Sequence, residues 1–230
     1  MLVFEYKQRV KLKKNIPYEC VSEKIAYFID STLGKDEKYL QFHNSKEYKN
    51  YVFDLLYPCE SDREYKSGKI YSFRIRTVSQ ELAEFFSAKL NYHISNEFQG
   101  LGGEVKIVEQ KILDKVYNLT PIILKNDGGY WRQNLSVQEF EERLLINLVK
   151  KYNAIQQTKL NENIQLYDFM EFKNDKPIKV KYKGKVLLGD KIQFVAAKNK
   201  VAQDLWYMAL GTGIGENNAR GAGFLNYRYL

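Results

Sequence analysis

The stretch that says most about the fold spans residues 209–224 and reads Ala-Leu-Gly-Thr-Gly-Ile-Gly-Glu-Asn-Asn-Ala-Arg-Gly-Ala-Gly-Phe. Its glycines follow a G-x-G-x5-G-x-G spacing, at Gly213, Gly215, Gly221 and Gly223. Because glycine has no Cβ and adopts positive φ freely, such a cluster lets backbone N–H groups approach a phosphate. The alternative interpretation is a connection between a helix and a strand that only packs tightly.

Two common phosphate-binding loops do not match this stretch. It follows a helical pattern and precedes a strand pattern, which is the reverse of the order that dinucleotide binding needs. No Gly-Lys-Ser/Thr follows the glycines, so a P-loop is excluded as well.

The half of the chain that ends in this stretch alternates between strand and helix patterns. In order, it shows a short strand at 119–124 with Pro121, a helix starting at the capping box Ser136-Val-Gln-Glu139, strand-like runs at 164–172 and 178–195, a helix ending at Gly211, and a strand at 224–229.

The first half has the same order with clearer signals. It shows a strand at 2–13, a helix from Pro17 to Gly34, a polar loop or short irregular piece at 35–50, strands at 51–57 and 69–77, a helix capped by Ser79, and a strand at 104–110.

Each half therefore predicts a βαββαβ unit, in which an antiparallel sheet carries both helices on one face. The fold class that follows is α+β, with tandem ferredoxin-like, RRM-like domains and a glycine-rich loop near the C-terminus. We place the domains at 1–112 and 118–230, with the join near 113–118.

Composition narrows the possible functions. The chain has 230 residues, a net charge of +8 and 14% aromatic residues, which suit nucleic acid without requiring it. Two cysteines and two histidines exclude a disulfide framework and a histidine-rich metal centre. A mean hydropathy of −0.49 and scattered charges predict neither a membrane span nor a secretory signal.

The segment 213–223 closely resembles the C-terminal glycine-rich signature of the repeat-associated (RAMP) superfamily of CRISPR proteins. In particular it is similar to the CRISPR repeat endoribonuclease (Cas six) family, which excises guide RNAs from a long precursor transcript. In that family the signature lies just before the last strand of the second ferredoxin-like unit, and segment 213–223 has the same position in this chain. The resemblance implies CRISPR repeat RNA as the partner, no cofactor and a prokaryotic cytoplasmic location. Other CRISPR effector subunits as partners, and a monomer or a homodimer, stay open.

The family cleaves RNA without metal, by attack of a ribose 2′-OH that leaves a 2′,3′-cyclic phosphate and a 5′-OH. This chemistry needs a base, a proton donor for the leaving oxygen and a cation. The resemblance implies His43 and Lys49, in the family's His-x5-Lys spacing, together with Tyr27 from the first helix. Lys46 is a second candidate cation, and Tyr39 and Tyr48 are alternative tyrosines. No cluster of residues has metal-ligand spacing, so we expect no metal.

RNA contacts are expected at the glycine-rich stretch and at nearby cations. Lys179, Lys181, Lys183 and Lys185 recur every second residue, so one strand would present them on one face, unless this is merely a solvated edge strand. The predicted RNA-binding residues are Gly213, Gly215, Arg220, Gly221, Gly223, Lys179, Lys181, Lys183, Lys198 and Arg228. Arg74 and Arg76 on the third strand are expected to extend the groove between the two units.

The sequence favours an endoribonuclease, because His43 and Lys49 are both present. The alternative is a non-catalytic RNA-binding RAMP subunit of a CRISPR effector complex, which would share the fold, the charge and the glycine stretch. A small-molecule-binding ferredoxin-like regulator is disfavoured by the basic charge.

Overall fold

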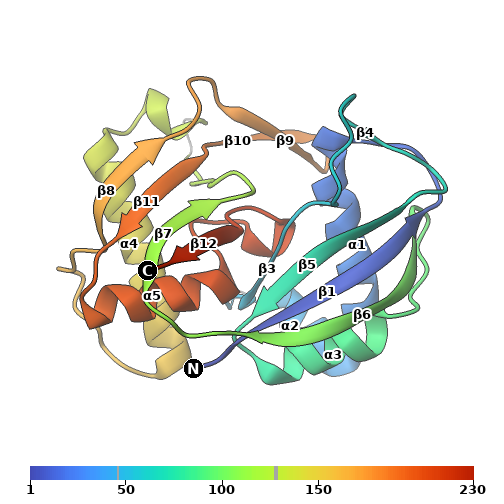
Figure 1. Cartoon of the computed structure of the whole chain (residues 1–230), viewed down its shortest axis with the longest axis horizontal. Helices are drawn as coiled ribbons and strands as arrows, with labels where there is room; N and C mark the ends of the chain where they lie inside the picture. Colours follow the sequence, from blue (N-terminus) through green and yellow to red (C-terminus); the bar gives the residue numbers. More distant parts are fainter. Residues whose placement is uncertain (46, 127–128) are drawn as a thin grey trace.

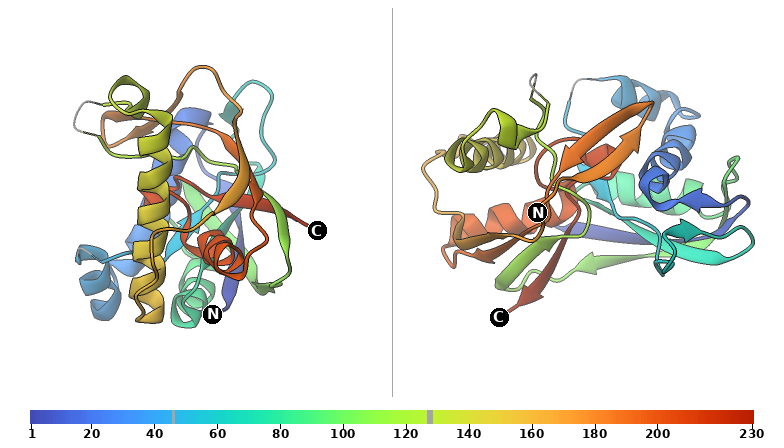
Figure 2. Two further views of the ribbon diagram at one scale, coloured as in Figure 1. Left: turned by 90° about the vertical axis from the view of Figure 1, so that its left-hand side faces the viewer. Right: turned by 90° about the horizontal axis from the view of Figure 1, so that it is seen from above.

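The structure is a computed structural model that describes residues 1–45, 47–126 and 129–230. Two four-stranded antiparallel sheets stand side by side (Figure 1). The second panel of Figure 2 shows the strands of both sheets along one side of the molecule and most of the helices along the other.

The first unit has the predicted βαββαβ order. Its elements are β1 (Val3–Leu12), α1 (Val21–Leu33), β3 (Tyr51–Phe53), β5 (Ile70–Thr77), α3 (Gln80–Leu90) and β6 (Phe98–Val108), and its strand order is β3-β5-β1-β6. Ser79 caps α3 as expected, because its side chain accepts a hydrogen bond from Leu82 N. The apolar stripe of α1, which includes Val21, Ile25 and Phe28, is fully buried against this sheet.

The second unit repeats the order. Its elements are β7 (Leu113–Asn118), α4 (Val137–Gln156), β8 (Tyr167–Phe172), β11 (Ile192–Ala196), α5 (Lys200–Thr212) and β12 (Leu225–Tyr229), and its strand order is β12-β7-β11-β8. The capping box of Ser136 and Glu139 starts α4 as predicted. The tandem ferredoxin-like fold is therefore confirmed.

Shorter elements decorate the two units. They are β2 (Ile16–Pro17), which pairs with β4 (Glu64–Tyr65), the hairpin of β9 (Ile178–Tyr182) and β10 (Lys185–Gly189), the helix α2 (Glu37–Asn44), and the 3-10 turns η1 (Tyr18–Cys20), η2 (Trp131–Gln133) and η3 (Asn218–Arg220).

Three local expectations were wrong. Residues 37–44 form α2 rather than a loop, because the Asp36 side chain caps the helix by accepting from Tyr39 N. The run 178–195 is a hairpin followed by β11, because Lys183 and Gly184 both have positive φ, as a two-residue turn requires. The first strand of the second unit is β7 at 113–118 and not the expected 119–124, where only an isolated bridge joins Ile122 to Asp190, so the chain passes from one sheet to the other at 109–112.

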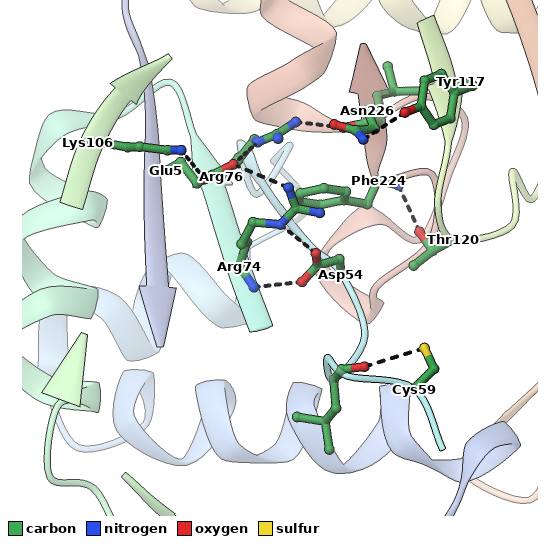
Figure 3. A network of polar contacts seen from close by, with 12 residues as sticks. Glu5, Asp54, Cys59, Arg74, Arg76, Lys106, Tyr117, Thr120, Phe224 and Asn226 are labelled. Atoms are coloured by element: carbon green, nitrogen blue, oxygen red, sulfur yellow. Dashed lines mark hydrogen bonds and ion pairs between the residues drawn. The ribbon is translucent and has the colours of Figure 1, made fainter. Parts of the chain in front are cut away.

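A buried ionic network joins the two units (Figure 3). Arg76 is 1% exposed, and its guanidinium donates to Glu5 Oε2 at 2.7 Å and to the Leu225 carbonyl at 2.6 Å. Arg74 donates to Asp54 Oδ2 at 2.7 Å. Arg76 is therefore a buried cross-link between β5 and β12, and the expectation that it extends an open groove was wrong.

Candidate active site

One cavity of about 580 Å³ is lined by both units. Side chains reach it from α1, from α2 and the segment that follows, from the turn between β9 and β10, from α4, and from the glycine-rich segment 211–224, called the glycine loop below. The residues lining it are Asp30, His43, Glu47, Tyr48, Lys49, Asn50, Tyr51, Lys125, Arg143, Asn147, Lys151, Tyr182, Lys183, Thr212, Gly215, Glu216, Asn217, Asn218, Ala219 and Arg220.

Positive side chains outnumber negative ones around this cavity. Six of the lining residues are Lys or Arg, and three are Asp or Glu. The cations are Lys49, Lys125, Arg143, Lys151, Lys183 and Arg220, and the acids are Asp30, Glu47 and Glu216. A concave surface with excess positive charge attracts anions such as the phosphates of a nucleic acid.

His43 lies in the last turn of α2 and faces α1. Its Nδ1 is 3.5 Å from Oδ1 of Asp30, and its side chain is 40% exposed, so the ring is open to the cavity on its other side. Burial raises the pKa of Asp30, while the positive charges of His43 and Lys183 act in the opposite direction. The structure thus pairs His43 with a carboxylate that the sequence analysis missed.

Lys49 closes the C-terminal end of α2. Its Nζ donates to the carbonyl oxygens of Phe42 and Ser45, the latter at 2.8 Å. Helix C-termini carry unpaired carbonyls and partial negative charge, which a lysine satisfies. Burial lowers the pKa of Lys49. The same short helix therefore holds both His43 and Lys49 at the cavity.

The three candidate tyrosines occupy different places. Tyr48 lines the cavity, and burial raises the pKa of its hydroxyl. Tyr39 faces α3, where its ring centroid lies 4.0 Å from that of Phe85. Tyr27 is 53% exposed and is not among the described residues that line the cavity. Lys46 lies outside the described residues.

The glycine loop is held mainly by close packing. Gly223 has a φ of +68°, and a Cβ there would lie 1.9 Å from the Ile214 carbonyl oxygen. A Cβ on Gly221 would lie 2.6 Å from Ser22 Oγ of α1 and equally close to the Phe53 ring of β3. The missing side chains therefore let the loop dock against the first unit.

Several N–H groups of the loop are already used within the protein. The glycine N–H groups at 213, 221 and 223 donate to the carbonyls of Ala209, Asn218 and Pro121 respectively, at 2.8–2.9 Å. The packing interpretation thus explains these three glycines, and Gly215 is the predicted glycine that lines the cavity. Contacts between the four glycines and RNA stay a prediction.

A buried lysine supports the loop from below. Lys151 of α4 is 3% exposed, and its Nζ donates to Gly213 O and Gly215 O at 3.0 Å each and to Asn218 Oδ1 at 2.7 Å. Burial lowers the pKa of Lys151 to about 7, and the charge of Glu216 opposes that shift only in part. The acceptors of Lys151 are all neutral oxygens, so no carboxylate of the described residues binds the ammonium directly.

Arg220 and Lys183 bring the loop and the hairpin turn to α1. Arg220 stacks on the Tyr182 ring at 4.7 Å, and its carbonyl accepts from Ser22 Oγ at 2.6 Å. Lys183 N donates to Glu23 Oε1 at 3.1 Å. Both side chains line the cavity, as a role in RNA binding would require.

The other predicted cations lie elsewhere. Lys179 and Lys181 share one face of β9, Lys183 lies in the turn and Lys185 is on β10, so the expected single face of four lysines was wrong. Lys181 pairs with Glu19. Arg228 pairs with Asp114 Oδ2 at 2.5 Å on the sheet of the second unit, and Lys198 is exposed near the same carboxylate.

Sequence reasoning missed the residues that α4 contributes. Arg143, Asn147 and Lys151 are four residues apart, a spacing that places side chains along one helix face. That spacing was available as a signal, but only the tertiary structure turns the face toward His43.

Within residues 1–45, 47–126 and 129–230, no cluster of three or more His, Cys, Asp or Glu side chains could hold a metal ion. Within the same ranges, no helix has the length and apolar character needed to cross a membrane.

Three solved structures share this fold over nearly their whole length. A CRISPR associated protein Cas6 is 20% identical with a TM-score of 0.69, covering 98% of this chain and 99% of that one. A RAMP protein binding different RNA substrates is 14% identical with a TM-score of 0.72 and the same coverage. The product of a Cas6-related gene from Pyrococcus furiosus is 15% identical with a TM-score of 0.70, covering 98% of both chains.

Sequence comparison identifies the family. No curated protein sequence matches the chain significantly. A family profile described as CRISPR associated protein Cas6, C-terminal, matches residues 104–227, which is more than half of the chain and includes α4, the hairpin and the glycine loop. The chain therefore belongs to the Cas6 family of CRISPR-associated proteins, the CRISPR repeat endoribonucleases that process CRISPR RNA.

Proposed function

We propose that this protein is a metal-independent endoribonuclease that cleaves CRISPR repeat RNA in precursor transcripts to give guide RNAs. The observation that carries the proposal is the cavity, where His43 of α2 and Lys49 of the segment after it face a mainly cationic surface built by the other unit. A proton-transfer group and a fixed cation within one anion-binding cavity are what RNA cleavage by its own 2′-OH requires.

The reaction transfers two protons, and at phosphorus one P–O bond forms while another breaks. A base removes the proton of the 2′-OH, and the 2′-oxygen bonds to the adjacent phosphorus. The bond from phosphorus to the 5′-oxygen breaks, and an acid protonates that oxygen. The products are a 2′,3′-cyclic phosphate and a 5′-OH, and no external reactant is consumed.

His43 is the group that exchanges a proton with the RNA. Asp30 occupies the Nδ1 side of the ring at 3.5 Å, which leaves Nε2 to face the substrate. Lys49 and Arg220 provide positive charge for the phosphorane. Tyr27 was expected to complete the site, but Tyr48 lines the cavity, so we expect Tyr48→Phe to slow cleavage more than Tyr27→Phe.

The RNA extends beyond the cleavage point. Lys183, Arg220 and Gly215 line the cavity and are proposed to bind the backbone next to the reacting phosphate. The outlying cations at 179, 181, 198 and 228 are proposed to contact more distant parts of the repeat. The remaining loop glycines are proposed to take part in RNA binding through the backbone shape that carries Gly215 and Arg220.

The test is to incubate the protein with labelled CRISPR repeat RNA in excess chelator and to analyse the ends of the products. We expect cleavage at one position, with a 2′,3′-cyclic phosphate on one fragment and a 5′-OH on the other. A single 2′-deoxy nucleotide at that position should abolish cleavage, because the attacking hydroxyl is gone.

Two outcomes would contradict the proposal. RNA that is bound but left intact would point to the non-catalytic RNA-binding subunit of an effector complex. Cleavage that continues at the 2′-deoxy position, or that stops when metal is chelated, would contradict the proposed chemistry.

A further inference from the structure

One face of α4 turns toward the cavity and has no part in the chemistry described above. It consists of Arg143, Asn147 and Lys151, called the α4 face below. Eight residues of helix span about 12 Å at about 1.5 Å per residue, which is the rise of about three to four stacked nucleotides at about 3.4 Å each. The face is therefore long enough to follow a short stretch of RNA.

Burial increases along this face. Arg143 and Asn147 are partly exposed, whereas Lys151 is 3% exposed beneath the glycine loop. Arg143 donates to the carbonyl of Lys125 at 2.7 Å, and Lys125 N donates to Glu216 Oε2 of the loop at 2.9 Å. These contacts tie the loop to both ends of the α4 face.

Asn147 has an unmet hydrogen-bonding capacity. Its Oδ1 is buried and has no partner among the described residues. The same is true of Asn50 Oδ1, which lines the same cavity from the first unit. A buried amide oxygen without a donor is costly, and a phosphate cannot supply one. A ribose hydroxyl or the N–H of a base can, so these amides fit a nucleotide rather than a bare anion.

We propose that the α4 face is a second RNA-binding wall of the cavity, in which Arg143 binds a phosphate, Asn147 accepts a hydrogen bond from a ribose or base, and Lys151 positions the glycine loop. This inference rests on the proposed function, since it assigns further contacts to the same RNA. It assigns the second unit a direct part in holding the RNA segment that His43 attacks.

Lys151 acts through the loop and not on the RNA. Its three donors are occupied by Gly213 O, Gly215 O and Asn218 Oδ1. Asn218 in turn donates through Nδ2 to the carbonyls of Ile214 and Ala222 at 3.0 Å each, which closes the loop on itself. Removing the ammonium would take a hydrogen-bond donor from all three oxygens and loosen the segment that carries Arg220.

The closing experiment measures RNA binding by fluorescence anisotropy at several salt concentrations, in a His43→Ala background that prevents cleavage. Arg143→Gln is compared with Lys150→Gln, since Lys150 is an exposed lysine of the same helix outside the cavity lining. Both changes remove one positive charge. We expect Arg143→Gln to weaken binding about three- to tenfold and to reduce the salt slope by about 0.7, the value for one single-strand phosphate contact. Lys150→Gln should leave both quantities close to those of the parent.

Asn147→Ala tests the hydrogen bond separately from charge. We expect it to weaken binding of the all-RNA repeat, and to do so equally at low and high salt. A series of repeats, each with one 2′-deoxy nucleotide, then locates the contact. If Asn147 reads a ribose, one 2′-deoxy position loses affinity in the parent but not in the variant.

Lys151→Met completes the set, with folding checked by thermal denaturation. We expect it to weaken RNA binding while Lys151→Arg, which keeps a cationic donor, restores part of the affinity. If Lys151 had a purely structural role, both variants would lose thermal stability, and Lys151→Arg would bind RNA no more tightly than Lys151→Met.

The outcomes separate the inference from the proposed function. If the parent binds no repeat RNA, both fail. If the parent binds RNA and the Arg143, Asn147 and Lys151 variants bind it equally well, the inference alone is overturned. If the protein with His43 intact binds RNA without cleaving it, and the variants bind more weakly, the inference stands and the catalytic proposal fails.

Discussion

The two ferredoxin-like units bring different chemistry to one cavity. The first unit contributes His43, whose ring can exchange a proton, and the ionisable side chains of Asp30 and Tyr48. The second unit contributes positive charge and a closely packed loop, through Arg143, Lys151 and the glycine loop.

This difference follows from how the two walls are built. The helix α2 is short and is held by the Asp36 cap at one end and Lys49 at the other, so its exposed side chains can meet a substrate. The glycine loop is buried at 211–215 and 221–224, and its shape depends on contacts that leave no room for side chains at its glycines. Two copies of one fold can thus line a single cavity with different chemical groups.

The largest expected effect concerns the first unit. His43→Ala should slow cleavage by about 10²- to 10⁴-fold, the usual contribution of one acid–base group, while RNA affinity stays close to that of the parent. Single-turnover cleavage and equilibrium binding measure the two quantities. His93→Gln is the matched control, because His93 packs on Phe28 and contacts Ser31 Oγ at 2.7 Å, outside the cavity lining. Equal losses in both variants would remove His43 from the mechanism.

The next effect concerns the packing of the second unit. Gly223→Ala should destabilise the protein by about 1–2 kcal/mol for its positive φ and by about 1–3 kcal/mol more for the overlap with the Ile214 carbonyl. Gly184→Ala is the control, since Gly184 has a φ of +73° but nothing within 4 Å of a Cβ. Urea denaturation gives both free energies of unfolding, and equal losses would contradict the packing role of the loop.

Lys151 should give the protein a measurable dependence of stability on pH. Its pKa is about 7 in the folded protein and 10.5 for the ordinary side chain. Between these values the unfolded chain binds more protons, so the contribution of Lys151 to the free energy of unfolding rises with pH. Lys151→Met should lose this rise, whereas Lys150→Met should keep it. Denaturant titrations from pH 6 to 10 test this, and parallel curves for the parent and Lys151→Met would contradict it.

The smallest effect distinguishes cations inside the cavity from those outside. Lys183 lines the cavity, whereas Lys181 is paired with Glu19. Lys183→Gln should reduce the salt slope of RNA binding by about 0.7, and Lys181→Gln by less, because an RNA phosphate would first have to displace Glu19. If the two variants reverse this order, RNA lies mainly on the outer face of the hairpin.

The predictions from sequence succeeded where the signal is local. The apolar stripe of α1, the Ser79 cap and the capping box of α4 depend on neighbouring residues, and all three are present. The predictions for α2 and for the hairpin failed for a related reason. Both depend on a single short feature. The helix α2 depends on the Asp36 cap within a polar segment, and the hairpin depends on the Lys183-Gly184 turn, which interrupts a run of regular alternation.

The sequence by itself determined the tandem fold, because strand and helix periodicity and capping residues act within about ten residues of chain. It also placed His43 and Lys49 close together in the chain, although the helix that carries His43 and the contacts of Lys49 with its C-terminal carbonyls were seen only in the structure. Only the tertiary structure decided that Asp30, Arg143, Asn147 and Lys151 share a cavity with them, and that Arg76 is a buried cross-link. Those neighbours come from distant segments, and their approach depends on how the two units dock through the glycine loop and the Arg76 network.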